Sequence, residues 1–240
     1  MTTTHRAFGG ILLALCTLTC RADGFVNVYE IPHNVSMNVI GNQLTHEILN
    51  RTFHHWDRHA AEQKAARAKA KQIAPQPRGS VARLLAQGVQ GDQANAQAAY
   101  QQAYRYHELV IKKFGLPSGD LGVGIASSIA GAWMAYNNKP FPDQYYLPLV
   151  QQMRKLATES ASFKTLSADD RAIAYEGLAI AGMMLASSQI TWERNPRAAG
   201  ADELKRRMRA QGGEMLTRML KMPPEQVGIG ASGFEILPAR

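Results

Sequence analysis

From about residue 92 onward, apolar residues recur at spacings of three and four, which is the repeat of an amphipathic α-helix. Residues rich in Gly, Pro and Asn interrupt this repeat, and Asp120 and Ser167 stand where helix-capping side chains are expected. The pattern predicts five successive helices with short connections, and hence an all-α fold, a compact helical bundle. The expected helices span residues 94–114, 121–137, 149–161, 167–189 and, beginning at Asn195-Pro196, 195–221.

Two stretches within these helices carry no charged residue, namely residues 121–138 and 177–192. Both are rich in Gly, Ala and Ser, with small residues placed four apart, a spacing that lets two helices approach closely. Both are short for a membrane span of about 20 residues and contain polar side chains. We therefore expect them to be the buried central helices of the bundle and membrane insertion to be unlikely, although a membrane-active protein remains an alternative.

The N-terminal part of the chain follows a different pattern. Residues 23–31 alternate briefly between apolar and polar sides, which is typical of a short strand or an extended arm. Further along, Ala, Lys and Gln dominate without an apolar stripe, and Pro75 and Pro77 interrupt the stretch. The expected organisation is an N-terminal extended or helical arm at 23–59, a mobile basic linker at 60–91, a helical domain at 92–222 and a glycine-containing tail at 223–240.

The first 22 residues have the layout of an export signal. Arg6 precedes an uncharged, mostly apolar run at residues 7–18, and small residues at Cys20 and Ala22 suit a signal peptidase. We therefore expect cleavage after Ala22 and a periplasmic or secreted protein. Two alternatives are a lipoprotein, which the residues before Cys16 and Cys20 fit poorly, and a retained anchor, for which the apolar run is short.

Composition narrows the chemistry that the exported chain could perform. The 240 residues contain two cysteines, and both lie in the expected signal, so the mature chain would have no disulfide, thiolate metal site or cysteine nucleophile. Loss of Arg6 and Arg21 would lower the net charge of +8 by two. The remaining positive charge is spread along the chain, which favours a role in solubility, and we expect no nucleic acid partner outside the cytoplasm.

Four histidines lie close together in the expected arm: His46, His54, His55 and His59. On a helix, His55 and His59 would be one turn apart on one face, a spacing at which two imidazoles can hold a metal ion. The alternative is a polar helix face without metal, because two ligands from one turn leave the remaining coordination positions unsupplied.

Glu176 is the candidate functional carboxylate, because it lies on an otherwise apolar helix. Burial raises the pKa of a carboxyl and can make it a general acid. In the helical region His107 is the only candidate base. The alternative is a carboxylate paired with an arginine of a neighbouring helix, such as Arg105 or Arg154.

Motifs for common chemistry are absent from the sequence. It contains neither a phosphate-binding P-loop nor a GxSxG nucleophile motif. We therefore assign no catalytic residue, no cofactor and no cofactor-binding residue. Four of the ten methionines lie at residues 208–222, where they fit a core-facing helical stripe and could also form an adaptable binding face.

Residues 95–235 resemble a family of exported bacterial proteins known only as a domain of unknown function. The resemblance rests on DLGVG at 120–124, AYNN at 135–138, LSADD at 166–170 and AYEGLA at 174–179. It implies an all-helical exported domain and carries over no catalytic residue.

The expected function is that of an exported, non-enzymatic helical binding protein of the bacterial envelope, with a protein partner there or outside the cell. One alternative is an immunity or inhibitor protein against an envelope-acting toxin or hydrolase. Another is an enzyme that uses Glu176.

Overall fold

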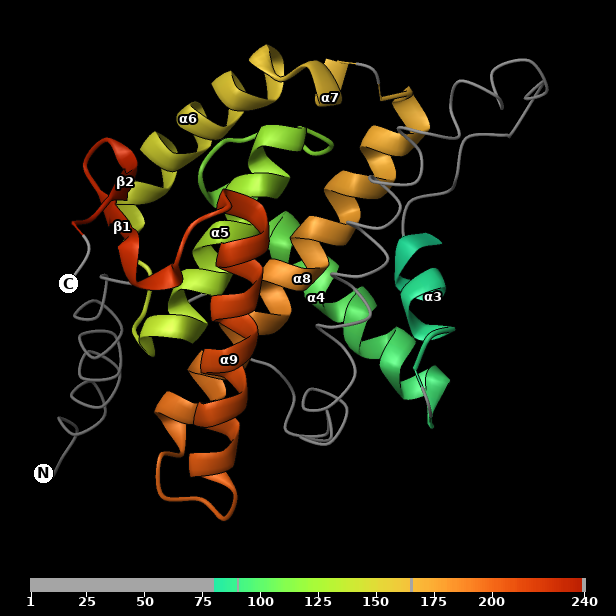
Figure 1. The fold of residues 1–240 in the computed structure, drawn as a ribbon. Coiled ribbons are helices and arrows are strands. Elements are labelled where there is room, and N and C mark those ends of the chain that lie inside the picture. The colour runs from blue at the N-terminus through green and yellow to red at the C-terminus, as the bar shows by residue number, and fades with distance from the viewer. Residues whose placement is uncertain (1–79, 90, 165, 239–240) are drawn as a thin grey trace, which may run out of the picture.

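The computed structural model describes residues 80–89, 91–164 and 166–238, and helices dominate this part of the chain (Figure 1). The prediction of an all-α bundle is confirmed. The longer helices in chain order are α3 (Ser80–Ala86), α4 (Gln93–Lys113), α5 (Leu121–Asn137), α6 (Tyr146–Glu159), α8 (Ala168–Arg194) and α9 (Ala201–Leu220). The shorter elements are η2 (Asp143–Tyr145), α7 (Ala161–Lys164), η3 (Pro224–Gln226), β1 (Val227–Gly230) and β2 (Gly233–Ile236).

Helices α5 and α8, which contain the two uncharged stretches, form the centre of the fold and make its most extensive helix–helix contact. Gly124 lies against Tyr175, and Gly131 lies against Gly182, so the contacts advance in the same direction along both helices. At the closest point the backbones touch, because a Cβ at Gly131 would lie 2.0 Å from the carbonyl oxygen of Gly182. Glycine is therefore required here by the spacing of the two helices.

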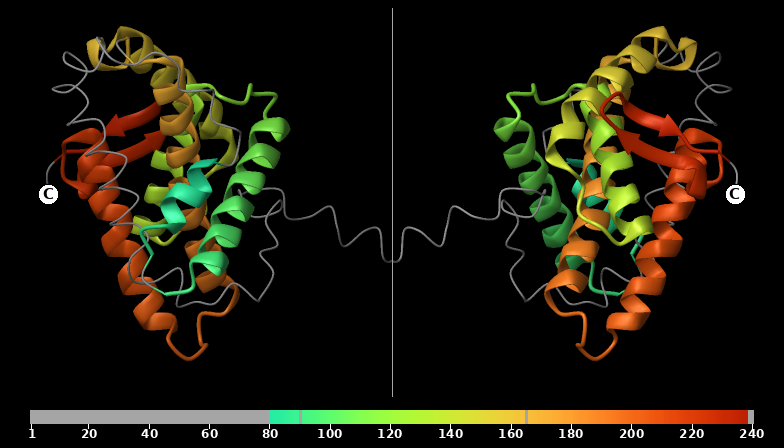
Figure 2. Two further views of the ribbon diagram at one scale, coloured as in Figure 1. Left: turned by 90° about the vertical axis from the view of Figure 1, so that its right-hand side faces the viewer. Right: turned by 90° about the vertical axis from the view of Figure 1, so that its left-hand side faces the viewer.

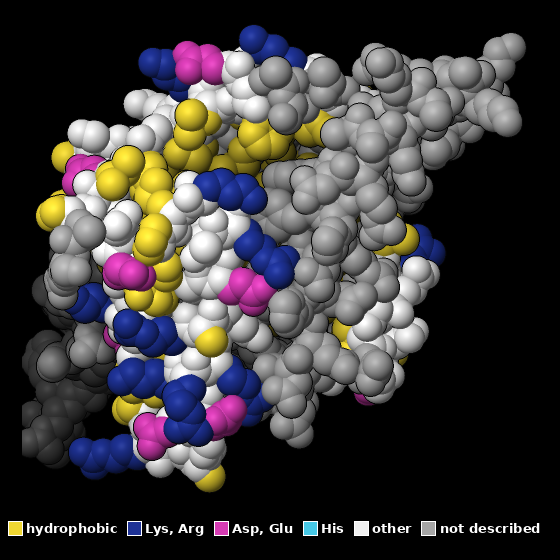
Figure 3. Space-filling view, in the orientation of Figure 1, with side chains coloured by type: hydrophobic (Ala, Val, Ile, Leu, Met, Phe, Trp, Pro, Cys, Tyr) yellow, Lys and Arg dark blue, Asp and Glu magenta, His cyan; other side chains and the backbone are white. Residues whose placement is uncertain are grey.

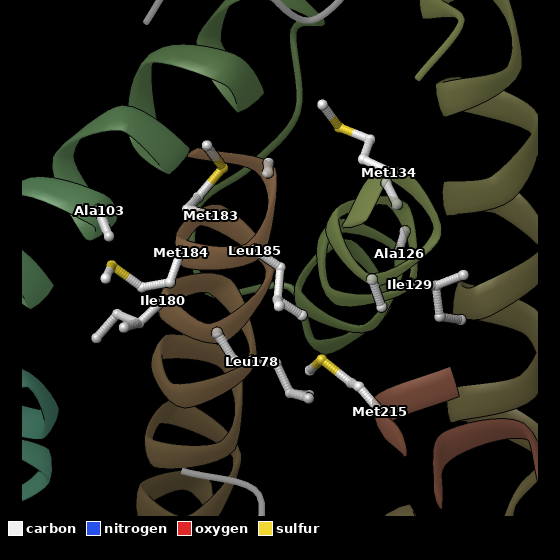
Figure 4. Packing of buried hydrophobic residues seen from close by; sticks show 14 of the residues in the cluster. Ala103, Ala126, Ile129, Met134, Leu178, Ile180, Met183, Met184, Leu185 and Met215 are labelled. Carbon is white, nitrogen blue, oxygen red and sulfur yellow. The ribbon is translucent and has the colours of Figure 1, made fainter. Parts of the chain in front are cut away.

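The other helices enclose this central pair. Figure 2 shows α4 and α9 on opposite sides of it, where α4 packs on α8 and α9 packs mainly on α5. Ile180 and Met184 of α8 point toward α4, whereas Leu185 of the same helix points toward α5 (Figure 4). Met215 is fully buried on α9, as the core-packing interpretation of its methionines predicts. Helix α8 thus has apolar side chains on several faces, which explains its burial between three helices.

Helix α6 returns the chain between the two central helices. Because α5 and α8 run in the same direction, the connection has to cross back along the molecule. Tyr146 at the start of α6 contacts Ser127, and Arg154, about two turns further, lies against Gly122, so α6 runs antiparallel to α5. Together α6 and α7 form an arch over the N-terminal end of α5 (Figure 1).

Side-chain caps fix the helix starts that the sequence indicates. The Asp92 carboxylate accepts from the amide of Asn95, Asp120 accepts from Val123, and the Ser167 hydroxyl accepts from Asp170. Each bond satisfies an amide that has no partner inside its helix.

Three details of the predicted helical pattern differ from the structure. Helix α8 continues to Arg194, and α9 begins at Ala201, after Gly200 adopts a positive φ of 82°. Pro196 therefore lies in the loop between the two helices, where a turn precedes the new start. Leu156, expected to face inward on α6, is 48% exposed because that part of α6 belongs to the outer arch.

The linker expected at residues 60–91 extends too far, because α3 forms within it. Val81, Ala82 and Leu85 of α3 are buried, and α3 packs mainly on α4. The basic, Ala-rich composition stops before this segment, and the apolar positions of one short helix were too few to predict it. The arm expected at 23–59 and the linker up to residue 79 lie outside the described residues.

The tail expected at 223–240 contains a β-hairpin. Strands β1 and β2 pair antiparallel, from Val227 opposite Ile236 to Gly230 opposite Gly233. The side-chain amide of Gln152 on α6 donates to the carbonyl oxygen of Phe234 at 3.0 Å, and its oxygen accepts from the Phe234 amide at 2.7 Å. This side chain takes the place of a third strand at that point, which stabilises a two-stranded sheet that is otherwise marginal.

Candidate functional site

The two histidines proposed as metal ligands, His55 and His59, lie outside the described residues. Within residues 80–89, 91–164 and 166–238, no three His, Cys, Asp or Glu side chains come together as a metal site. The hypothesis of a metal site in the arm therefore stays a prediction.

Glu176 is buried on α8, with 6% of its surface exposed. The two arginines proposed as its partners are engaged elsewhere: Arg154 donates to Asp120, and Arg105 donates to Gln102. Burial raises the pKa of the Tyr104 hydroxyl to about 12, and Glu108 and, to a smaller extent, Glu176 add to this shift. His107, the candidate base for an enzyme that uses Glu176, contacts Ser127 and Tyr175.

A chain of polar side chains, buried except for Glu108, crosses the interior, and we call it the His107 chain. Its members are Glu108 and His107 of α4, Ser127 of α5, Tyr146 of α6 and Tyr175 of α8. Nε2 of His107 is 2.9 Å from the Ser127 hydroxyl, which is 2.6 Å from the hydroxyl of Tyr146. On the other side of the ring, the Tyr175 hydroxyl lies 3.4 Å from Nδ1 and donates to Glu108 at 3.1 Å.

The Ser127 hydroxyl is the junction of these contacts. Its oxygen lies within hydrogen-bond distance of three groups: the Val123 carbonyl oxygen at 2.9 Å, His107 Nε2 and the Tyr146 hydroxyl. A hydroxyl carries one proton and two lone pairs, so it can serve all three partners, one as a donor and two as an acceptor. The His107 chain therefore ties four helices together through hydrogen bonds in the interior.

A serine beside a histidine is also the arrangement of an activated nucleophile. Ser127, however, is 3% exposed, and His107 is completely buried. Burial also raises the pKa of the Tyr146 hydroxyl to about 12, so that this group stays neutral. Because Ser127 and His107 are buried and contact one another and neighbouring polar groups, we interpret the His107 chain as structural.

A cavity of about 690 Å³ lies between the loop that precedes α5 and the arch of α6 and α7. Figure 3 shows hydrophobic side chains exposed beneath this arch, with Lys and Arg side chains beside them. A Cβ at Gly122 would lie 2.7 Å from the backbone of Arg154, so α5 and α6 are in direct contact at the cavity wall. The residues that line the cavity are Ser118, Gly119, Asp120, Leu121, Gly122, Arg154, Ala157, Thr158, Phe163, Lys164 and Arg171.

The cavity is linked to the His107 chain through one side chain. Ser118 lines the cavity, and its hydroxyl donates to the Glu108 carboxylate at 3.0 Å. The pKa of the Glu108 carboxyl is lowered, first by the neighbouring His107 ring and then by the hydroxyls of Ser118 and Tyr175. The distance from Nδ1 of His107 to the Glu108 carboxylate oxygen is 3.9 Å, which is longer than a hydrogen bond. His107 therefore lowers the pKa of Glu108 because its ring lies close to the carboxylate, without a direct hydrogen bond.

We expect the Glu108→Gln variant to be less stable than wild type by about 1 kcal/mol at neutral pH. The folded-state pKa of Glu108 lies below its ordinary value of 4.5. Its stabilisation is therefore present above pH 4.5 and is lost as the pH falls through the folded-state pKa. Urea denaturation of both proteins across this range checks the prediction, because the difference in unfolding free energy should shrink toward acid pH.

The control for this experiment is Glu159→Gln on α6, since the Glu159 side chain is 61% exposed. A difference between wild type and Glu108→Gln that stays constant down to acid pH, or that Glu159→Gln reproduces, contradicts the role given to Glu108.

The sequence did not point to this cavity. Three separate stretches supply its cationic side chains, Arg154 from α6, Lys164 from α7 and Arg171 from α8. Only the arch brings them together, and the one available signal was the DLGVG motif at 120–124 that borders the cavity.

Comparison with known proteins identifies a family only. The model of DUF6683, a family of unknown function, matches residues 2–237. No curated protein and no solved structure matches the chain. Among the helices that the structure describes, none is both long enough and apolar enough to cross a membrane.

Proposed function

The chain belongs to the DUF6683 family, and we propose that it is an exported, non-enzymatic binding protein whose ligand enters the cavity between α5, α6 and α7. The observation that carries the proposal is the cavity itself. Its volume of about 690 Å³ falls within the range of small-molecule sites. Its lining places three apolar side chains beside charged and hydroxyl groups that can orient a ligand.

The rigidity of the cavity walls supports binding. Gly122 allows the backbones of α5 and α6 to touch, and Arg154 bonds to Asp120 at 2.7 Å across the same contact. The Ser118 side chain is fixed by its hydrogen bond to the Glu108 carboxylate. A site whose walls are already in place loses less conformational entropy when a ligand binds.

The non-enzymatic part of the proposal rests on the His107 chain. The chain's serine and histidine are the nearest approach to a catalytic arrangement in the described residues, and both are buried and engaged in internal hydrogen bonds. Hydrolysis of an envelope substrate by the purified protein would contradict this part.

Export is proposed from residues 1–22, and it gives a direct prediction. We expect the chain recovered from the periplasm or the medium to begin at Asp23, because Ala22 ends the signal. Mass spectrometry of the purified protein measures the N-terminus. The Leu13→Arg variant, which places a charge in the apolar run, is the control and should remain unprocessed. Recovery of chains that begin at Met1 in the cytosol alone would contradict export.

Ligand binding can be tested without knowing the ligand. We expect native mass spectrometry of the protein isolated from its own compartment to show an additional small-molecule mass. Replacing Ala157, which lines the cavity, by Trp fills the site and should abolish that mass. The matched control is Ala172→Trp at an exposed position of α8. Equal retention by both variants, or no added mass in wild type, contradicts the proposal.

A further inference from the structure

We infer that the ligand of this cavity carries an anionic group, a carboxylate or a phosphate, joined to an apolar body. The inference deepens the proposed binding function and rests on it. It depends on the balance of charge in the cavity wall and on the position of the apolar side chains there.

The charge in the wall is positive and incompletely compensated. Three of the described lining residues are cations, Arg154, Lys164 and Arg171, and one is an acid, Asp120. One carboxylate oxygen of Asp120 accepts from Arg154, while the other accepts from the Val123 amide. Asp120 therefore pairs with Arg154, and each of its oxygens already accepts one hydrogen bond.

Lys164 and Arg171 provide the positive charge that is available to bind a ligand. Within the described part of the chain neither has a carboxylate partner, and Arg171 donates only to the backbone oxygen of Lys164, at 3.5 Å. Asp169 and Asp170 adjoin Arg171 in sequence but are not among the described lining residues. A carboxylate or phosphate placed between these two side chains would gain charge-assisted hydrogen bonds, and arginine suits both groups because it can donate two parallel bonds.

The same wall disfavours other ligand classes. A cationic ligand would be repelled by Lys164 and Arg171, and a neutral ligand would leave their charges uncompensated. The hydroxyls of Ser118 and Thr158 also line the cavity and can supplement the binding of an anionic oxygen.

Apolar side chains complete the site. Leu121, Ala157 and Phe163 line the cavity beside the cations. These side chains would cover an apolar part of the ligand and remove it from water. A free inorganic anion would leave them exposed, so we expect it to bind more weakly than an anion that carries an alkyl or aromatic body.

Calorimetric titration of the purified protein with four probes tests this inference. Octanoate and octyl phosphate carry an anion and an alkyl chain, octanamide keeps the chain without the charge, and inorganic phosphate keeps the charge without the chain. We expect at least one of the anionic amphiphiles to bind about tenfold or more tightly than octanamide and inorganic phosphate. The ranking of octanoate against octyl phosphate identifies which anion the site prefers.

Two sets of variants assign the binding to the cavity. The double variant Lys164→Gln/Arg171→Gln should lose the preference for the charged probe while it keeps the thermal stability of wild type. The matched control is Lys205→Gln/Arg206→Gln on α9, which removes the same number of charges from a surface outside the cavity. It should bind the probes as wild type does. Equal loss in both double variants contradicts the inference.

The outcomes separate this inference from the proposed function. If octanamide binds as tightly as octanoate and octyl phosphate, and Ala157→Trp abolishes all three, the anionic group is refuted and the cavity remains a binding site. If no probe binds, the inference is refuted. The proposed binding function is then decided by native mass spectrometry alone, that is, by whether the isolated protein carries an additional small-molecule mass.

Discussion

The Gly131→Ala variant should unfold at a much lower denaturant concentration than wild type. An added Cβ would fall 2.0 Å from the Gly182 carbonyl oxygen, and the obstacle is the backbone of a buried helix. The methyl group can be accommodated only if α5 and α8 move apart, which disrupts the most extensive helix contact of the fold. We expect a loss of about 3 kcal/mol in the free energy of unfolding, at the upper end of overpacking effects.

The matched control is Gly213→Ala, the same chemical change in the interior of α9. There the nearest atom to the new Cβ is in the Tyr136 ring at 3.1 Å, a side chain that can shift. Alanine also favours the helix over glycine, so the net change should stay within about 1 kcal/mol of zero. Urea denaturation measures both variants. Equal stability of Gly131→Ala and Gly213→Ala would contradict the packing of α5 against α8.

Replacement of His107 by alanine should have the second large effect. The variant removes a completely buried ring and leaves a cavity among four helices. It also removes a hydrogen-bond partner of Ser127 and a polar partner of Tyr175. Loss of packing and loss of buried hydrogen bonds add, so we expect a decrease of about 3 kcal/mol in the free energy of unfolding.

Tyr146→Phe separates the two contributions, because it deletes one hydroxyl of the His107 chain and retains the ring. The Ser127 oxygen would keep its bonds to Val123 and His107, so the expected loss is about 1 kcal/mol. Chemical denaturation at neutral pH provides both values. If His107→Ala is as stable as Tyr146→Phe, the His107 chain does not hold the helices together.

The sequence predicts the helices best where capping residues and the apolar repeat agree. Helix α5 begins after Asp120 and ends before Asn138, as expected, because the Asp120 side chain caps the start and Asn138 adopts the left-handed conformation. The start of α9 could not be placed in the same way, since Pro196 fits a helix start by its residue type alone. The observed start depends on the positive φ of Gly200, a property of the loop that the sequence does not determine.

The hairpin and the exposed Leu156 depend on tertiary contacts. Strand β2 is only four residues long, and its fixed position relies on Gln152, which is 82 residues away from Phe234 in sequence. Leu156 fits the apolar repeat of α6, but its part of the helix arches away from the core. Neither feature is encoded by a local pattern.

The candidate site was less predictable than the fold. Glu176 is buried, as its apolar surroundings suggested, but its pairing with His107 depended on how α8 turns against α4. In the structure Tyr175, the adjacent residue, meets His107 instead. Prediction of the cavity would have required the relative positions of α5, α6, α7 and α8. These positions follow from the parallel packing of α5 and α8 rather than from a sequence motif.

Mapping of backbone amide chemical shifts during a titration with octanoate tests the central claim most directly, because it reports where on the protein an anionic amphiphile binds. The account predicts that the largest changes fall at the residues that line the cavity, namely 118–122, Arg154, Ala157, Thr158, Phe163, Lys164 and Arg171. Changes that concentrate on α9, or that are absent from these lining residues at saturating octanoate, would contradict it.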